Sequence, residues 1–162
     1  MLLDATGEIT DGWTRIADEA KIPENGAIIV PHDRLEEALT RRPATGVALP
    51  NDTELADLAA HLPRLGLIAV DFPSFADGRG FSIGQRLRDM GFEGRLRAHG
   101  PVIADQFAYL LACGFDEVEV PADLASRQPV AQWLAQLDKI TLGYQRGRST
   151  GSILDQRRSA MS

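Results

Sequence analysis

The sequence predicts a single α/β domain with a mainly parallel sheet of about five strands and flanking helices. From residue 26 onward, short apolar runs alternate with amphipathic stretches across short links, which is typical of right-handed strand–helix–strand crossovers. The length of 162 residues suits one domain with its own core, and 44% hydrophobic with 25% charged residues is ordinary for a globular protein. A flavodoxin-like sheet and a partial barrel both fit, because strand order is not visible in the sequence.

The expected strands are short apolar runs of the kind that a parallel sheet buries on both faces. They lie at residues 27–30, 47–49, 67–70, 94–98 and 117–120.

The expected helices combine start signals with apolar residues at helical spacing. Two begin at acidic or amide caps, Asp33 and Asn51, and a third begins near Ser82, where Ser82 and Gln85 form a capping-box pattern. A fourth covers about residues 101–113, where Gly114 is expected in the left-handed position that ends a helix. The last begins at Pro129, with inward positions Val130, Trp133, Leu134 and Leu137.

The two ends of the chain are polar. We expect residues 1–25 to form an N-terminal extension packed on the domain at 26–143, with a short strand or hairpin over 8–15 and Trp13 as a packing anchor. Residues 144–162 are rich in glycine, serine and arginine, which predicts a flexible or partner-docked tail.

Composition excludes several classes of function. The net charge of −6 argues against nucleic acid as a partner, because phosphate contacts need a concentrated basic face. No apolar run approaches the ~20 residues of a membrane span, and the first residues lack a secretory pattern, so we expect a cytoplasmic protein. Cys113 is the single cysteine; it is expected to be a buried apolar residue, and it allows no internal disulfide, iron–sulfur cluster or cysteine-based zinc site.

No cofactor motif is present. The sequence contains no G-x-x-x-x-G-K-[ST] loop, no G-x-S-x-G elbow and no H-E-x-x-H helix, and the glycines around Arg79 complete no G-x-G-x-x-G. The cofactor is therefore unknown, and no metal site is expected.

The strongest candidate site is the glycine–arginine segment at residues 77–80, between the third strand and the helix expected at Ser82. Two glycines and a guanidinium beside the free N–H groups of a helix start can hold a small anion. Because ligands gather at the carboxyl ends of parallel strands, we expect one shared rim. Its candidate residues are Asp71, Asp77, Gly78, Arg79, Gly80, Ser82, Arg97, Asp105 and Gln106.

Structural explanations stay open for most of these residues. Arg79 can pair with a nearby carboxylate in a tight turn, and Asp77 can cap its own loop. Asp71 can form a salt bridge with Arg97, and Asp105 can serve a helix dipole. His99, at a strand end, is either a proton carrier or a surface residue.

The charge pattern suggests a protein partner. Residues 1–40 hold nine acids against three bases, whereas residues 79–99 hold five arginines against Asp89 and Glu93. Such a basic segment can dock an acidic partner, or it can be a solvated helix face.

An ordered series of motifs resembles a bacterial family labelled "oxidoreductase probably involved in sulfite reduction". The likeness covers roughly residues 11–145. Its motifs are Asp11-Gly-Trp13, residues 46–51, Asp71-Phe72, Phe75, residues 77–82, Leu96-Arg-Ala98, Asp105-Gln106 and residues 113–116. The resemblance implies an accessory or electron-transfer-type protein of assimilatory sulfite or sulfate reduction that acts with a reductase. The alternative is a non-catalytic adaptor or anion-sensing domain without redox chemistry.

Overall fold

The computed structural model describes residues 1–145, so most of the predicted tail at 144–162 lies outside the described residues. Its strands form one sheet in the order β2-β1-β8-β7-β6-β5-β4-β3. Neighbours from β3 to β8 are parallel, whereas β1 runs antiparallel to β8, and β2 to β1. The strands are β1 (Leu2–Asp4), β2 (Gly7–Glu8), β3 (Thr14–Arg15), β4 (Ile28–Pro31), β5 (Thr45–Leu49), β6 (Leu65–Asp71), β7 (Arg95–His99) and β8 (Glu117–Glu119).

The predicted α/β class and the mainly parallel sheet are confirmed. The five expected strands are β4 to β8, and the three short N-terminal strands bring the sheet to eight. Consecutive strands lie side by side from β3 to β8, which excludes the flavodoxin-like order. The sheet curls into a half-barrel, so the partial-barrel alternative is the correct one.

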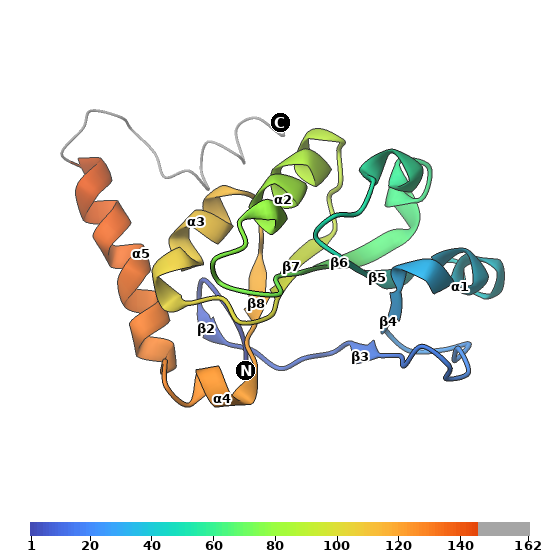
Figure 1. Cartoon of the computed structure of the whole chain (residues 1–162), viewed down its shortest axis with the longest axis horizontal. Coiled ribbons are helices and arrows are strands. Elements are labelled where there is room, and N and C mark those ends of the chain that lie inside the picture. The colour runs from blue at the N-terminus through green and yellow to red at the C-terminus, as the bar shows by residue number, and fades with distance from the viewer. Residues whose placement is uncertain (146–162) are drawn as a thin grey trace.

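The helices follow from this order. Right-handed crossovers between successive neighbouring strands all place their connections on the same face of a sheet. Figure 1 shows α1, α2 and α3 on that face, with α5 beyond the β2 edge. The helices are α1 (Leu35–Arg41), α2 (Arg79–Asp89), α3 (Phe107–Ala112), α4 (Ala122–Ala125) and α5 (Val130–Gln145), with 3-10 turns at His32–Arg34, Leu55–Leu58, Leu62–Arg64 and Ala104–Gln106.

The main core lies between the sheet and the helices. Because side chains alternate along a strand, Ile68 and Val70 of β6 face this core, whereas Leu67 and Ala69 face the opposite side. We call that opposite side the open face. Leu67 and Ala69 form a second, smaller cluster there with Ile29.

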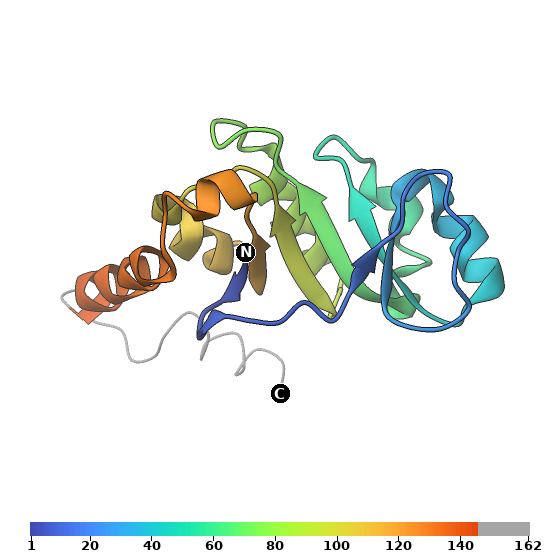
Figure 2. The same ribbon diagram turned by 90° about the horizontal axis from the view of Figure 1, so that it is seen from below.

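An N-terminal strap, residues 9–13, covers part of the open face. Figure 2 looks onto this face and shows the segment between β2 and β3 crossing the sheet near the starts of the strands. Trp13 packs on two glycines of the sheet: a Cβ at Gly46 or Gly66 would lie 3.1 or 3.0 Å from its ring. Trp13 is therefore a packing residue, and the glycines make room for it.

Several local predictions need correction. The range 8–15 does contain strand residues, in β2 and β3, but they form no hairpin: Glu8 pairs with Leu3, and Arg15 runs parallel to Ile29. The helix expected from Asn51 is two 3-10 turns, and the one expected over 101–113 becomes regular only at Phe107. The short helix α4 was not expected.

Helix α2 begins at Arg79, three residues before the predicted start. The Ser82–Gln85 pattern therefore lies inside the helix and caps nothing. Among the described residues, no helix has the length and apolar character needed to cross a bilayer.

Candidate functional site

Polar side chains line the open face along β7 and β8. On β7, Leu96 and Ala98 face the main core, so Arg95, Arg97 and His99 face the open side. Strand register sets Glu117 beside Arg97, and His99 between Asp71 and Glu119. The sheet thus carries charged and titratable groups where a helix would otherwise pack.

Arg97 is the centre of a buried ion cluster. Its side chain is 1% exposed. Its Nε donates to Glu117 at 2.8 Å, its Nη1 to Glu119 at 3.1 Å, and its two Nη atoms to Asp11 of the strap at 3.0 and 2.9 Å. Burial alone would lower the pKa of Arg97, but the hydrogen bonds to Asp11 and Glu117 raise it. Arg97 is therefore a permanent cation whose donors are already used.

Asp71 and His99 form a hydrogen-bonded pair at the carboxyl ends of β6 and β7. The Nδ1 of His99 lies 2.9 Å from the Oδ1 of Asp71, and both side chains are over a third exposed. Because a carboxylate can only accept, the Nδ1–H of His99 donates to Asp71; this bond orients the ring and leaves Nε2 as the atom that can meet a ligand. The predicted salt bridge between Asp71 and Arg97 is not formed, because Arg97 uses three other carboxylates.

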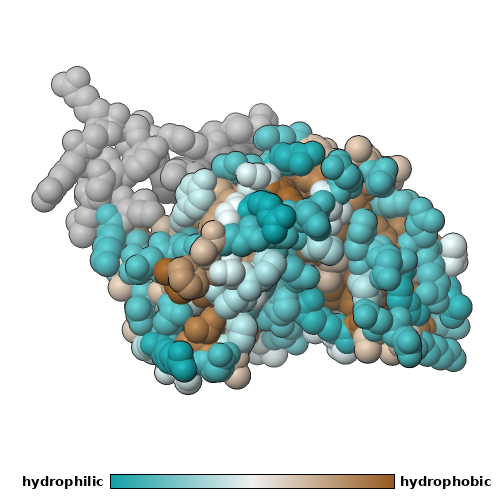
Figure 3. Space-filling view, in the orientation of Figure 1, coloured by the Kyte–Doolittle hydropathy of each residue, from teal (hydrophilic) through white to brown (hydrophobic). Residues whose placement is uncertain are grey.

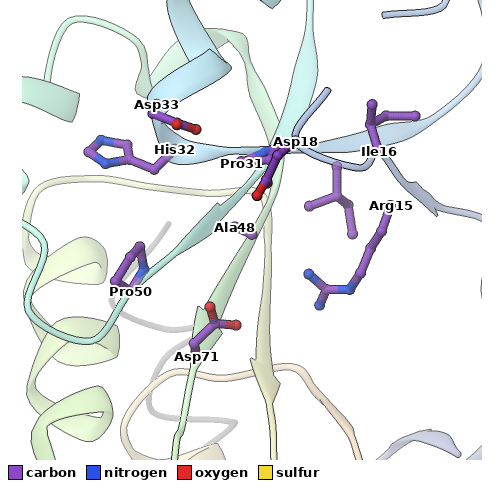
Figure 4. A pocket seen from close by; sticks show the side chains of 10 residues that line it. Arg15, Ile16, Asp18, Pro31, His32, Asp33, Ala48, Pro50 and Asp71 are labelled. Carbon is purple, nitrogen blue, oxygen red and sulfur yellow. The ribbon is translucent and has the colours of Figure 1, made fainter. Parts of the chain in front are cut away.

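An open pocket lies beside this pair. Its volume is about 370 Å³, and its walls come from residues 15–18, from the ends of β4 and β5, and from Asp71. Figure 4 shows Arg15, Asp18 and Asp71 around the space over Ala48. Arg15 is held by Glu119 at 2.9 Å. Burial alone would raise the pKa of Glu119, but Arg15 lowers it below its usual value.

In the glycine–arginine segment, Arg79 is paired with a carboxylate. Asp77 accepts hydrogen bonds from the backbone N–H of Arg79 at 3.2 Å and from its Nε and Nη2 at 3.0 and 2.8 Å. Arg79, followed by Asn51, lowers the pKa of Asp77. The alternative interpretation, an arginine paired with a nearby carboxylate, is the correct one.

The glycines of α2 serve packing. A Cβ at Gly80 would lie 2.5 Å from the Phe72 ring, and a Cβ at Gly84 would lie 2.4 Å from the Phe115 ring. Gly78 is the residue before the helix. Two aromatic rings can therefore lie directly against the helix backbone.

The remaining candidates have structural partners or lie on the surface. Ser82 is exposed on α2. Asp105 accepts from Gln136 at 3.3 Å. Gln106 accepts from the Ile103 N–H at 3.1 Å and donates to the Phe75 carbonyl at 2.7 Å, which ties the β6–α2 loop to the start of α3.

The nine predicted site residues thus fall into separate groups. Asp71 and Arg97 face the open side, in different clusters, while Asp77 and Arg79 bind each other at the start of α2. Sequence reasoning missed Asp11, Arg15 and Glu119 as partners. The available signal was the placement of charged residues at every second position within 95–99 and 117–119. This alternation puts arginines and glutamates on one face of adjacent strands.

The predicted basic segment is largely neutralised. Arg88 donates to the carbonyls of Phe92, Gly94 and Gly114 and to Asp116, and Arg95 binds Glu117. Arg88 therefore connects α2 to the segments that precede β7 and β8.

A different surface presents aromatic groups. Phe75 and Tyr109 are 56% and 55% exposed. Gln106 binds the Phe75 backbone, and the ring of Phe81 lies 4.8 Å from that of Tyr109, so both belong to one region between α2 and α3. We call Phe75, Tyr109 and the two exposed arginines of α2, Arg79 and Arg86, the aromatic–arginine surface. Figure 3 shows that small apolar patches interrupt the polar surface of the molecule.

Tyr109 also has an unusual partner. A hydrogen bond with the thiol of Cys113, one helical turn later, raises the pKa of Tyr109. Cys113 itself is buried, and Gly114 follows it with φ +110° while the Phe115 N–H bonds to the Leu110 carbonyl. The predicted helix end at Gly114 is confirmed.

These features define an α/β half-barrel with a charged open face and a helical face that carries exposed aromatics. The chain belongs to the family described as bacterial protein of unknown function (DUF934), whose model matches residues 46–153. Neither a curated protein nor a solved structure matches it significantly. The matched region includes Arg97 and the aromatic–arginine surface, but not the strap or Arg15.

Proposed function

We propose that this protein is a cytoplasmic accessory or electron-transfer-type protein of assimilatory sulfite or sulfate reduction, and that it works by docking a reductase. The pathway comes from the resemblance of the 71–82 and 113–116 motifs to the sulfite-reduction family. The observation that carries the docking role is the aromatic–arginine surface.

The composition of that surface suits a protein partner. Aromatic residues and arginines dominate the energetics of protein interfaces when they are buried on binding. Phe75 and Tyr109 expose more than half of their area, and Arg79 is 63% exposed. Arg86 is exposed two helical turns from Arg79, so both can meet one partner. Because Arg79 already binds Asp77, the complementary surface is mainly apolar, with acidic groups at its edge.

A second candidate function is a ligand-sensing adaptor without redox chemistry. The open pocket beside Asp71 and His99 favours it, because its walls are held in place by Arg15–Glu119 and by the Asp71–His99 bond. One measurement, the turnover of a purified reductase, distinguishes the two functions. An electron-transfer component raises the turnover of a purified reductase when it is added, whereas an adaptor changes complex formation alone.

The test is growth of a deletion strain of the host bacterium on sulfate and on cysteine. We expect the strain to grow on cysteine but not on sulfate, and the wild-type gene to restore growth on sulfate. The double variant Phe75→Ser, Tyr109→Ser should fail to restore it while its thermal stability stays close to that of the wild type. Arg127→Ser, at an exposed position between α4 and α5, is the control and should restore growth fully.

Two results would contradict the proposal at different points. Normal growth of the deletion strain on sulfate would remove the pathway role. Full rescue by the double variant would keep the pathway role and reject the aromatic–arginine surface as its working surface.

A further inference from the structure

The pocket on the open face has no part in the docking role proposed above. It is built from the sheet face opposite α2 and α3, at the carboxyl ends of β4 and β5 and the end of β6. Parallel α/β sheets bind ligands at this end, because the loops there leave polar groups around a space that no strand fills. The strap lies near the other end of the strands and leaves the pocket open.

The size and floor of the pocket suit a small organic molecule. Its volume of about 370 Å³ lies at the lower end of the range for ligand sites. Ile16, Ile29 and Ala48 give it an apolar floor, and Pro31 and Pro50 add rigid walls. A ligand with a short apolar body can therefore exclude water from this floor.

The charges around the pocket favour a cation. Three aspartates, Asp18, Asp33 and Asp71, line it against one arginine, which is a net formal charge of −2 when His32 is neutral. The one arginine, Arg15, is paired with Glu119 at 2.9 Å, so its charge is partly cancelled. Figure 4 shows the carboxylates of Asp18 and Asp71 directed toward the space that they share. An anion such as sulfite would meet this net negative wall.

We propose that this pocket binds a small organic cation, an amine or guanidinium compound with a short apolar body. The apolar end lies on Ile16, Ile29 and Ala48, and the cationic end meets the three aspartates that line the pocket, Asp18, Asp33 and Asp71. An organic cation fits better than a metal ion, because within the described residues no group of three His, Cys, Asp or Glu is placed to hold a metal. The assignment does not depend on the proposed function, so binding can be present whether or not the growth test succeeds.

The experiment compares three probes of the same shape and different charge: benzylamine, benzyl alcohol and benzoate. Each is titrated into the full-length, ¹⁵N-labelled protein, and the Kd is taken from amide shifts of pocket residues. We expect benzylamine to bind in the millimolar range, at least about fivefold more tightly than benzyl alcohol, because solvent-exposed ion pairs each add a small attraction. Benzoate should bind least.

Two variants locate the cation. Asp33→Asn and Asp71→Asn should each weaken benzylamine about two- to fivefold and leave benzyl alcohol unchanged. Asp57→Asn, at an exposed position of the 3-10 turn Leu55–Leu58, is the matched control and should bind like the wild type. Asp33 is exposed, and its side chain makes no hydrogen bond within the part of the chain that the structure describes. Loss of folding therefore cannot explain an effect of Asp33→Asn on binding.

Three results would overturn the assignment. They are tighter binding of benzoate than of benzylamine, equal binding of benzylamine by the wild type and both pocket variants, and no shift of pocket amides at about 50 mM benzylamine, well above the expected Kd.

Discussion

The role predicted for Arg97 from the sequence differs from the role that it has in the structure. In the sequence it was a candidate for anion binding, because its planar guanidinium suits oxyanions. In the structure it is buried and bound by Asp11, Glu117 and Glu119. A buried guanidinium is tolerated only with such partners, because its desolvation costs several kcal/mol. Asp11 lies 86 residues before Arg97 in the sequence, and no local sequence pattern predicts that the two side chains bind each other.

Asp11 should make the stability of the protein depend on acid pH. Its hydrogen bond with Arg97 lowers its pKa below the ordinary value of about 3.9. A lowered pKa in the folded state adds stability above the unfolded-state pKa, and this stability is lost as pH falls through the folded-state pKa. Asp11→Asn should therefore lose about 1–3 kcal/mol of unfolding free energy at pH 7 and show a shallower decline below about pH 4 than the wild type.

Urea unfolding at neutral and acid pH measures this difference. Glu119 has a lowered pKa as well and keeps part of the acid sensitivity in both proteins. Asp57→Asn is the control with no expected change. Parallel pH profiles for wild type and Asp11→Asn would show that the strap contact carries no charge-dependent stability.

At the scale of single elements, periodicity located all five main strands and most helices, but it misread α2. The glycines at 78 and 80 suggested a loop that ends at Ser82, since glycine is a poor helix former. The helix accepts Gly80, and Gly84 in its interior, because Phe72 and Phe115 occupy the space where side chains would be. Phe72 directly follows β6 and Phe115 precedes β8, so the reason for these glycines is not local. The helix expected from Asn51 is replaced by two short turns, Leu55–Leu58 and Leu62–Arg64.

Alanine at Gly84 should therefore destabilise the protein. An exposed glycine in a helix would gain up to about 1 kcal/mol from this change. Here a Cβ would lie 2.4 Å from Phe115, and overpacking of a filled core costs about 1–3 kcal/mol. Gly80→Ala, at 2.5 Å from Phe72, should behave in the same way.

Gly78→Ala is the matched control, since its φ is −83° and the nearest atom would be 3.8 Å away. Thermal and urea unfolding of the three variants gives the comparison. A stabilised Gly84→Ala protein would mean that Phe115 moves freely away from α2.

At the scale of the whole molecule, local alternation predicted the crossovers but not the order of the strands. The sheet is sequential from β3 to β8, and the first fifteen residues supply both of its outer regions: β1 and β2 beyond β8, and β3 beyond β4. Two- and three-residue strands have no periodicity to detect, and their partners lie as far as 117 residues away, in the case of Leu2 and Glu119. The open face is consequently the part of the molecule that sequence reasoning described least well, and the pocket and the Arg97 cluster both lie there.

Removal of residues 1–13 should expose this face. The truncated chain loses β1 and β2, the Asp11 carboxylate and the Trp13 ring that packs on Gly46 and Gly66. The apolar cluster of Ile29, Leu67 and Ala69 then meets solvent, and exposed apolar surface promotes association. We expect a lower midpoint of urea unfolding, binding of the dye ANS and self-association in size-exclusion chromatography. Gly12→Ala, with nothing within 4 Å of its added Cβ, is the control, and a truncated chain as stable and monodisperse as this control would show that the strap is dispensable.

The pairing of β1 with β8 also affects the order in which the sheet can form during synthesis. The ribosome makes β1 more than a hundred residues before its neighbour β8, since Leu3 pairs with Val118. At about 5–20 residues per second, β1 waits roughly 6–23 s before its partner strand has been synthesised. During that interval β4 to β7 can assemble in order as they emerge, each beside the strand before it, while one edge of the growing sheet stays unpaired. The residues of β1 are thus made before those of β4 to β7 but placed in the sheet after them, and a chaperone that holds β1 would act within this interval.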